Sequence, residues 1–178
     1  MDDRSRRTVL AASGAALAGL AGCTSLPGSG NDAEGGGADG STPAGLTLAT
    51  YDVGGSSGET VPVRAPEGVT LLDFFATWCA PCKPMMDELR QVRSEYPDLH
   101  MLSITWEREQ AAIESFWREY EGTWNVASDP DITTGEKYGV GGQLPTTLVL
   151  DADGNEAWRH TGLVRADDIA AEVEAARE

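Results

Sequence analysis

Apolar and polar residues follow strand and helix patterns in turn from Leu46 onward. Two runs, residues 69–76 and 99–106, are almost continuously apolar, which is typical of strands buried on both faces. Other segments carry apolar residues at helical spacing, and these cover residues 81–96, 108–122 and 165–178. Strands and helices in this order predict an α/β domain, a central mixed sheet with helices on its faces, over residues 46–178.

Shorter segments complete the predicted domain. Near its start, "LTLATYDV" and "TVPVRA" indicate two short strands joined by a glycine-rich turn, which form an extra N-terminal β-hairpin. Residues 123–129 predict a further short strand, and residues 131–138 a short helix. Near its end, "TTLVLD" and "NEAWRHTG" predict a hairpin whose turn lies at Asp153-Gly154.

The first 22 residues have the pattern of an export signal. Arginines at positions 4, 6 and 7 precede a mildly apolar stretch, residues 9–21, that is rich in Ala and Gly. "SRRTVL" resembles a twin-arginine signal, and "LAGC" resembles a lipobox, in which the sulfur of Cys23 would carry a lipid. The alternative is a short alanine-rich helix after basic residues.

Residues 23–45 consist mainly of Gly, Ser, Pro and acidic residues, with almost nothing to bury. Such a composition predicts a flexible linker between the lipid and the domain. No apolar run in the sequence approaches the ~20 residues that a membrane-spanning helix needs. We therefore expect an exported protein that a lipid anchors to the outer face of the cytoplasmic membrane.

The chain is strongly acidic, with 13 Lys and Arg against 29 Asp and Glu and a formal net charge of −16. The lysines among them are Lys83 and Lys137 alone. This composition excludes the basic surface that binds nucleic acid. It also predicts a fold that needs salt, because like charges destabilise the compact state and molar salt screens them. An ordinary acidic protein remains the alternative.

Two cysteines stand two residues apart in "TWCAPCKP", residues 77–84. Cys79 follows the predicted strand at residues 69–76, and Cys82 lies at the start of a predicted helix. Backbone N–H groups and the helix dipole stabilise a thiolate at such a position. We therefore expect Cys79 to be the more exposed sulfur and the attacking one, and Cys82 to resolve the mixed disulfide.

The residues around the two cysteines favour the same chemistry. Pro81 suits a first helical turn, where its missing N–H is not needed. Lys83 adds a positive charge nearby, and Trp78 offers an apolar docking surface beside the sulfur. With Cys23 assigned to the lipid, the three cysteines of the chain leave Cys79 and Cys82 as one pair.

Two other roles for this pair stay open. A structural metal site needs a fuller ligand set, for which the sequence adds only His100 and His160. A purely structural disulfide would close a very short loop and would stabilise the fold little. We predict no metal and assign no role to either histidine.

"VTLLDFFATWCAPCK" and "LPTTLVLDADGN" together resemble the thioredoxin superfamily, and the added N-terminal hairpin resembles its exported, membrane-tethered TlpA-like branch. The resemblance covers most of residues 46–178 and implies a thioredoxin-like three-layer fold. It implies a protein disulfide oxidoreductase with a redox-active Cys79–Cys82 disulfide and no other cofactor. It also implies a cis peptide at Pro145, a Leu144 backbone that pairs with the substrate chain, and substrate contacts from Trp78 and Pro81.

Asp73 lies six residues before Cys79 inside an apolar run, so its carboxyl should point into the core. Burial of an acid is costly and raises its pKa. Thioredoxins place an aspartate at this spacing as the acid and base for the buried cysteine, and the resemblance implies that role here. An edge aspartate that reaches water is the alternative. Many TlpA-like proteins use instead a glutamate at the position of Met85, and the segment 138–145 is one residue longer than usual.

The expected partners are thiols and disulfides of proteins on the outer face of the membrane, with a membrane electron donor or acceptor. The Asp73 arrangement favours reduction, although the sequence does not reveal the direction of electron flow. Cytochrome c maturation is the usual task in the TlpA-like branch, but no residue identifies that client. The alternatives are an oxidase that donates disulfides to exported proteins, and a copper-delivery or copper-binding lipoprotein on the same fold.

Overall fold

The computed structural model describes residues 45–178, and its centre is a five-stranded mixed sheet in the order β5-β4-β3-β6-β7. The middle strand, β3, pairs in parallel with β4 and antiparallel with β6. The outer pairs are β4 with β5, which is parallel, and β6 with β7, which is antiparallel. The strands are β3 (Thr70–Phe74), β4 (His100–Thr105), β5 (Asn125–Ser128), β6 (Thr146–Leu150) and β7 (Glu156–Thr161).

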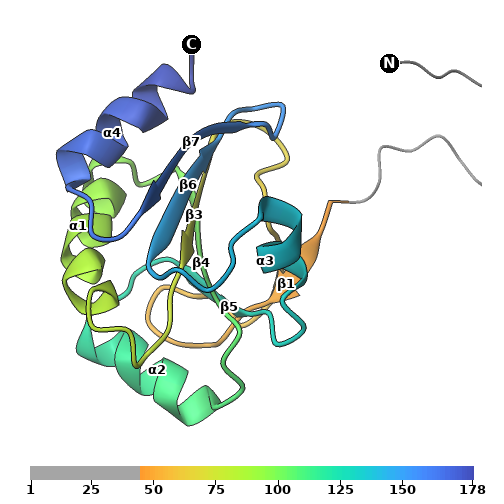
Figure 1. Ribbon diagram of the computed structural model, residues 1–178, viewed down its shortest axis with the longest axis vertical. Coiled ribbons are helices and arrows are strands. Elements are labelled where there is room, and N and C mark those ends of the chain that lie inside the picture. The colour runs from red at the N-terminus through yellow and green to blue at the C-terminus, as the bar shows by residue number, and fades with distance from the viewer. Residues whose placement is uncertain (1–44) are drawn as a thin grey trace, which may run out of the picture. The chain divides into compact units, whose positions relative to one another are not determined.

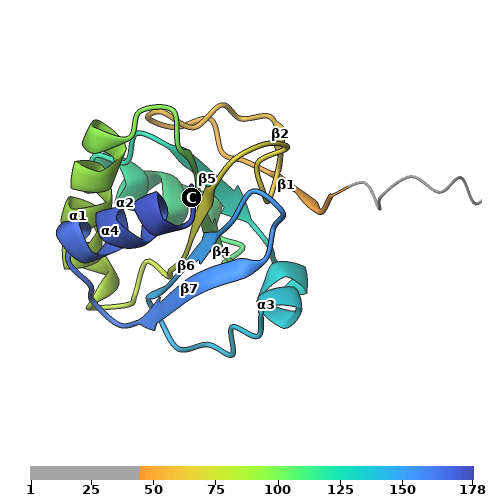
Figure 2. The ribbon, with the colours of Figure 1, turned by 90° about the horizontal axis from the view of Figure 1, so that it is seen from above.

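Helices cover both faces of this sheet, as Figures 1 and 2 show. On one face lie α1 (Cys82–Glu95), α2 (Gln110–Glu119) and α4 (Ala166–Ala175). The short helix α3 (Thr133–Tyr138) lies on the other face. The predicted three-layer α/β fold is therefore confirmed, with most of the helical mass on one side.

An extra hairpin precedes the sheet, as predicted. Its strands, β1 (Thr47–Ala49) and β2 (Thr60–Pro62), pair antiparallel and form a small sheet of their own. A single bridge between Thr50 and Ala127 connects the hairpin with β5. The hairpin covers part of the sheet face on which α3 also lies. Leu48 and Val63 pack there in one cluster with Leu72 and other residues of that face.

Side chains alternate between the two faces of β3, as strand geometry requires. Leu71 and Phe75 pack on the face of α1, α2 and α4, whereas Leu72 and Phe74 pack on the opposite face. All four are fully buried or nearly so. Full burial of such a side chain contributes about 1.5–3 kcal/mol, so β3 holds both halves of the core together.

Gly122 follows α2 and lies directly against the ring of Trp117, where a Cβ atom would collide with the indole. The helix was expected to reach this glycine, but it ends at Glu119, since Glu121 adopts a positive φ of 52°. The Gly122 N–H donates to the carbonyl of Trp117 at 2.9 Å and closes the turn. The glycine is thus required for close packing against Trp117.

The predicted signal peptide, residues 1–22, lies outside the described residues. So do Cys23 and the rest of the predicted linker up to residue 44. Within residues 45–178, none of the helices combines the length and the apolar character needed to cross a membrane.

Candidate functional site

Cys79 and Cys82 form a disulfide, with their Cα atoms 5.3 Å apart. Cys79 lies in the segment that connects β3 to α1, and Cys82 is the first residue of α1. The disulfide therefore follows the carboxyl end of a central strand, where open α/β sheets place their chemistry. This is the position that the sequence predicted for the pair.

The two cysteines are almost equally buried in this oxidised state. Cys79 is 4% exposed and Cys82 is 2% exposed, so the expected difference in exposure is small. Both side chains pack in the core cluster beneath α1. Trp78, by contrast, is 70% exposed. It offers an apolar surface next to Cys79 in the chain.

The start of α1 carries no competing negative charge. Pro81 occupies the N-cap position, no side chain caps the helix, and its first turn contains no acidic residue. The α1 helix is 14 residues long, and the partial positive charge at its N-terminus is left to act on the sulfurs. Exposed Lys83 lies in the same turn. These features favour a thiolate at Cys79 once the disulfide is reduced.

Glu107 fixes the residue that precedes Trp78. Its carboxylate accepts a hydrogen bond from the Thr77 backbone N–H at 2.6 Å and another from the Thr77 hydroxyl at 2.8 Å. The Thr105 hydroxyl, at the end of β4, donates to the same carboxylate at 3.3 Å. Glu107 is half-buried and lies two residues after the end of β4, so it ties the cysteine loop to the neighbouring strand.

The peptide bond between Leu144 and Pro145 is cis, as the sequence resemblance implied. Pro145 is buried and directly precedes β6, whose first residue, Thr146, lies opposite Phe74 at the end of β3. This register brings Leu144 and Pro145 to the edge of the sheet that carries the disulfide. Leu144 makes no backbone–backbone hydrogen bond with any residue in 45–178, so its peptide groups are available to another chain.

Asp73 is buried near the end of β3, and its side chain lies on the sheet face that α1, α2 and α4 cover. The alternation along β3 places it on the same face as Leu71 and Phe75, which pack with both cysteines. The Ser103 hydroxyl donates to Asp73 Oδ2 at 3.0 Å, and the Trp124 indole N–H donates to Ser103 Oγ at 2.9 Å. The other carboxyl oxygen, Oδ1, has no hydrogen-bond partner among the described residues.

Burial raises the pKa of Asp73 from 3.8 to about 7, and the hydrogen bond from Ser103 opposes part of this rise. The other fully buried aspartate of the described chain, Asp129, has a different environment. Its carboxylate accepts hydrogen bonds from the Thr133 N–H and from both the N–H and the hydroxyl of Thr134. Asp129 therefore accepts hydrogen bonds from the first residues of α3. One carboxyl oxygen of Asp73, by contrast, has no hydrogen-bond partner, and with a pKa of about 7 this carboxyl can gain or lose a proton near neutral pH.

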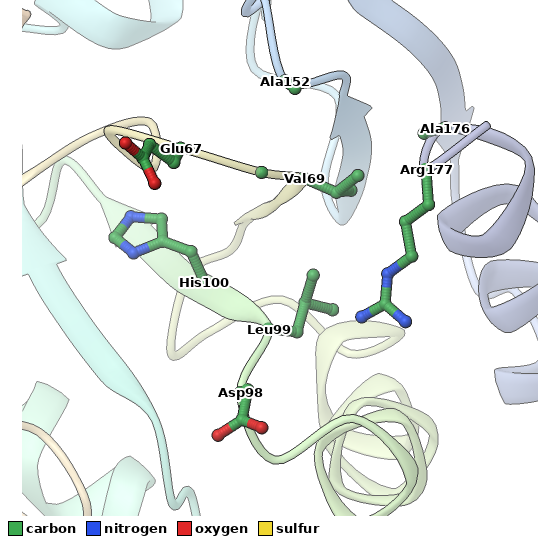
Figure 3. A pocket seen from close by; sticks show the side chains of 9 residues that line it. Glu67, Val69, Asp98, Leu99, His100, Ala152, Ala176 and Arg177 are labelled. Carbon is green, nitrogen blue, oxygen red and sulfur yellow. The ribbon is translucent and has the colours of Figure 1, made fainter.

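A separate surface cavity of about 260 Å³ lies at the other end of the central strands (Figure 3). Its lining includes Val69, which directly precedes β3, and His100, the first residue of β4. The His100 ring shares a 3.0 Å hydrogen bond with the carbonyl of Pro62, and burial lowers its pKa. His100 thus connects the N-terminal hairpin to β4 and has no place at the disulfide.

The described residues hold no cluster of three or more His, Cys, Asp or Glu side chains arranged for a metal ion.

The structure brings the predicted site residues together around the end of β3 that leads to the disulfide. They are Asp73, Trp78, Cys79, Pro81, Cys82, Leu144 and Pro145. Sequence reasoning missed Thr77, Ser103, Glu107 and Trp124. The position of Glu107, just past a parallel strand, was a usable signal; the polar Ser103 inside an apolar strand was another.

The AhpC/TSA family matches residues 45–158 of this chain. The thiol-disulfide oxidoreductase ResA of Oceanobacillus iheyensis is 29% identical over 98 residues, which cover 53% of this chain and 50% of that protein. ResA of Geobacillus thermodenitrificans is 29% identical over 106 residues, or 58% of this chain and 60% of the relative. The chain spans about half the length of the first of these relatives.

Solved structures show the same fold. StoA from Bacillus subtilis superposes with a TM-score of 0.63 at 20% identity, covering 73% of this chain and 96% of that one. The exposed lipoprotein thioredoxin of Streptococcus pneumoniae gives a TM-score of 0.59 at 22% identity and covers 71% of this chain and 99% of that one. The thioredoxin-like fold inferred from the sequence is therefore confirmed.

Proposed function

This chain belongs to the AhpC/TSA family, and we propose that it is a thiol–disulfide oxidoreductase that acts on other proteins through Cys79 and Cys82. The observation that carries this proposal is the Cys79–Cys82 disulfide between the end of β3 and the start of α1. Relatives named thiol-disulfide oxidoreductase support it. The half-satisfied carboxyl of Asp73 on the same face supplies an acid and base for the second sulfur.

In the reducing direction the Cys79 thiolate attacks one sulfur of a client disulfide, and the other client sulfur leaves as a thiolate. Cys82 then loses its thiol proton to Asp73 and attacks Cys79, which closes the internal disulfide and releases the second client sulfur. Two electrons pass from the pair to the client, which takes up two protons. Asp73, with its pKa near 7, is suited to accept the Cys82 proton and later return it.

Client recognition uses the edge at which the disulfide lies. The exposed ring of Trp78 and neighbouring Pro81 provide apolar contact beside the sulfurs. The peptide groups of Leu144, before cis Pro145, pair with an extended client segment as an added strand. Backbone pairing of this kind accepts many side chains, so it suits a protein that serves more than one client.

The proposed site of action is the outer face of the cytoplasmic membrane, to which a lipid on Cys23 would attach the chain. "LAGC" and the linker that follows support this placement, and the pneumococcal neighbour is named as an exposed lipoprotein. A reductant outside the cytoplasm must itself be reduced again after each turnover. The proposal therefore includes a membrane electron donor as the second partner.

The reduction potential of the Cys79–Cys82 pair, equilibrated with glutathione or dithiothreitol in molar KCl, tests the direction. A potential of about −270 mV, as reducing proteins of this fold have, would support the reducing direction. A potential of about −120 mV would make the chain an oxidase. Reduced protein should also reduce insulin disulfides, whereas Cys79→Ala should not. Failure of the reduced parent to open any disulfide would refute the oxidoreductase itself.

A further inference from the structure

One hydrogen bond supports the buried carboxyl of Asp73. Among the described residues, the Ser103 hydroxyl alone donates to it, at 3.0 Å to Oδ2, and the other carboxyl oxygen has no partner. Asp73 is 3% exposed and Ser103 is fully buried, so bulk water does not reach this bond. Stabilisation of the ionised carboxyl by hydrogen bonding therefore depends on a single hydroxyl.

Within residues 45–178, no buried cation faces Asp73 from the elements packed against it. The start of α1 contributes the disulfide, and the buried residues of α2 and α4 are aliphatic or aromatic. Every charged side chain of these three helices is at least partly exposed. In the sheet, Asp73 has Ser103 on one side and Thr147 on the other, and Thr147 lies opposite the half-buried His160 of β7. The Ser103 hydroxyl is thus the polar contact that favours the carboxylate over the neutral acid.

Trp124 sets the direction in which the Ser103 hydroxyl points. Its indole N–H donates to Ser103 Oγ at 2.9 Å, and an indole N–H cannot accept. Ser103 Oγ is therefore the acceptor in that bond, and its own proton has Asp73 Oδ2 as its only acceptor among the described residues. A hydroxyl that accepts one bond while it donates another is polarised, which strengthens the bond that it donates.

Packing holds the Trp124 ring where its N–H reaches Ser103. The ring is buried and meets Trp117 edge-on, with centroids 5.0 Å apart. Trp117 in turn packs against Phe75, which follows Asp73 by two residues, with centroids 5.8 Å apart. Trp117 is also fully buried, but its own N–H has no hydrogen-bond partner among the described residues. The two indoles share the packing of this cluster, and of the two only Trp124 supplies a hydrogen bond.

We propose that Trp124 is a positioning residue for Asp73: its N–H keeps the Ser103 hydroxyl directed at Oδ2, and so keeps the buried carboxyl able to ionise. Without that N–H, the hydroxyl is free to turn and accept a proton from neutral Asp73, which would stabilise the acid instead of the carboxylate. Burial already favours the acid and raises the pKa of Asp73 to about 7, and the Ser103 bond opposes that rise. Trp124 therefore acts on the carboxyl through Ser103.

The use of this device in disulfide exchange rests on the proposed function, in which Asp73 is a base. A base must be ionised before it can accept a proton, so a carboxyl that stays neutral at the working pH contributes little. Loss of the Trp124 N–H should therefore move the range in which Asp73 is active to higher pH. The titration of Asp73 itself is measurable in the oxidised protein, where the cysteines are closed in the disulfide and do not titrate.

The test follows the carboxyl carbon of Asp73 by NMR, in oxidised protein with isotope-labelled aspartate in molar KCl, and Asp73→Asn identifies the signal. The parent should titrate with a midpoint of about pH 7. Ser103→Ala removes the bond to the carboxylate and should raise the midpoint by about one pH unit or more. Trp124→Phe should raise it by about half a pH unit or more. In the Ser103→Ala background Trp124→Phe should add nothing, because Trp124 acts through Ser103.

Three further variants separate the hydrogen bond from packing. Trp117→Phe shortens the neighbouring buried indole but removes an N–H that has no partner, and Thr147→Val removes an unbonded hydroxyl on the other side of Asp73. Both should keep the midpoint within about 0.3 pH units of the parent. Trp124→benzothienylalanine keeps both rings and lacks only the N–H, so it should raise the midpoint as Trp124→Phe does. An unchanged midpoint in this variant, or an equal rise in Trp117→Phe, would overturn the role of Trp124.

The proposed function is tested separately on reduced protein with 5,5′-dithiobis(2-nitrobenzoate). Cys79 attack releases one thionitrobenzoate anion, and Cys82 attack on the resulting mixed disulfide releases a second. The pH profile of the second release should move upward together with the midpoint of Asp73. A raised midpoint with an unmoved profile would uphold the positioning by Trp124 and refute the use of Asp73 as a base. A parent that releases only one anion would refute the oxidoreductase itself.

Discussion

The carboxylate of Glu107 holds both donors of Thr77, the backbone N–H at 2.6 Å and the hydroxyl at 2.8 Å. Thr77 stands two residues before Cys79, so this contact fixes the chain just where it turns toward the disulfide. A hydrogen bond to a charged group contributes about 1.5–3 kcal/mol. We therefore expect Glu107→Ala to lower the free energy of unfolding by about 3 kcal/mol, measured by urea denaturation in molar KCl.

Glu109→Ala is the matched control for that change. Glu109 is exposed, and its side chain does not cap α2. Its substitution should alter the free energy of unfolding by less than about 0.5 kcal/mol. Equal effects of the two substitutions would show that the Glu107 contact does not stabilise the cysteine loop.

Asp73 makes the stability of the fold depend on pH. The pKa of Asp73 is about 7 in the folded chain and near 3.8 when exposed, so between these values the folded state holds a proton that the unfolded state has lost. Stability from this group therefore falls as pH rises from about 4 to about 7 and then levels off. Asp73→Asn removes the titration and should be more stable than the parent by on the order of 3 kcal/mol near pH 8.

Thermal unfolding of parent and Asp73→Asn across this pH range measures the difference. The two melting curves should converge toward pH 4 and separate as the pH rises. A constant offset at all pH values would mean that the carboxyl is not buried as the structure shows, and Asp73 would then be an ordinary strand residue.

Salt should stabilise the fold through charge screening. The net charge of −16 raises the free energy of the compact state, and the screening length falls from about 10 Å at 0.1 M to about 3 Å at 1 M. The melting temperature should rise steeply up to about molar KCl and then flatten. A continued linear rise would indicate salting-out instead, and a flat profile throughout would remove the expected dependence on salt.

Much of the fold could be predicted from the sequence because its signals are local. The apolar run around Leu72, the helical spacing after Cys82 and the turn at Asp153-Gly154 each fixed an element within a few residues of its observed ends. Proline and cysteine spacing also placed Pro145 correctly, through the family resemblance. Ends were the least accurate, as at α2, where a positive φ at Glu121 stops the helix before Gly122.

Contacts between distant strands could not be predicted in the same way. The bonds from Ser103 to Asp73 and from Thr77 to Glu107 join residues that are 30 positions apart. They depend on which strands are neighbours, and a single sequence shows only that each strand exists. The near-equal burial of Cys79 and Cys82 was likewise unexpected, because it follows from how the closed disulfide packs beneath α1.

The proposed lipid anchor can be tested on its own. Cys23→Ala should release active protein into the soluble fraction outside the cell, because the linker and domain then have nothing to hold them at the membrane. Immunoblots of washed membranes and of culture medium measure the distribution, with a variant altered at Ser25 as a control that keeps the cysteine. Retention of Cys23→Ala on membranes after a high-salt wash would show that another feature anchors the chain.

The division of labour between Cys79 and Cys82 is tested most directly by trapping. Cys82→Ser leaves the attacking sulfur without a resolving partner, so after incubation with a disulfide-containing client protein in molar KCl it should accumulate a stable mixed disulfide. Non-reducing gels and mass spectrometry should locate that bond at Cys79, and Cys79→Ser should accumulate little. A mixed disulfide that forms mainly through Cys82, or none in either variant, would contradict the assignment of Cys79 as the nucleophile of a protein disulfide oxidoreductase.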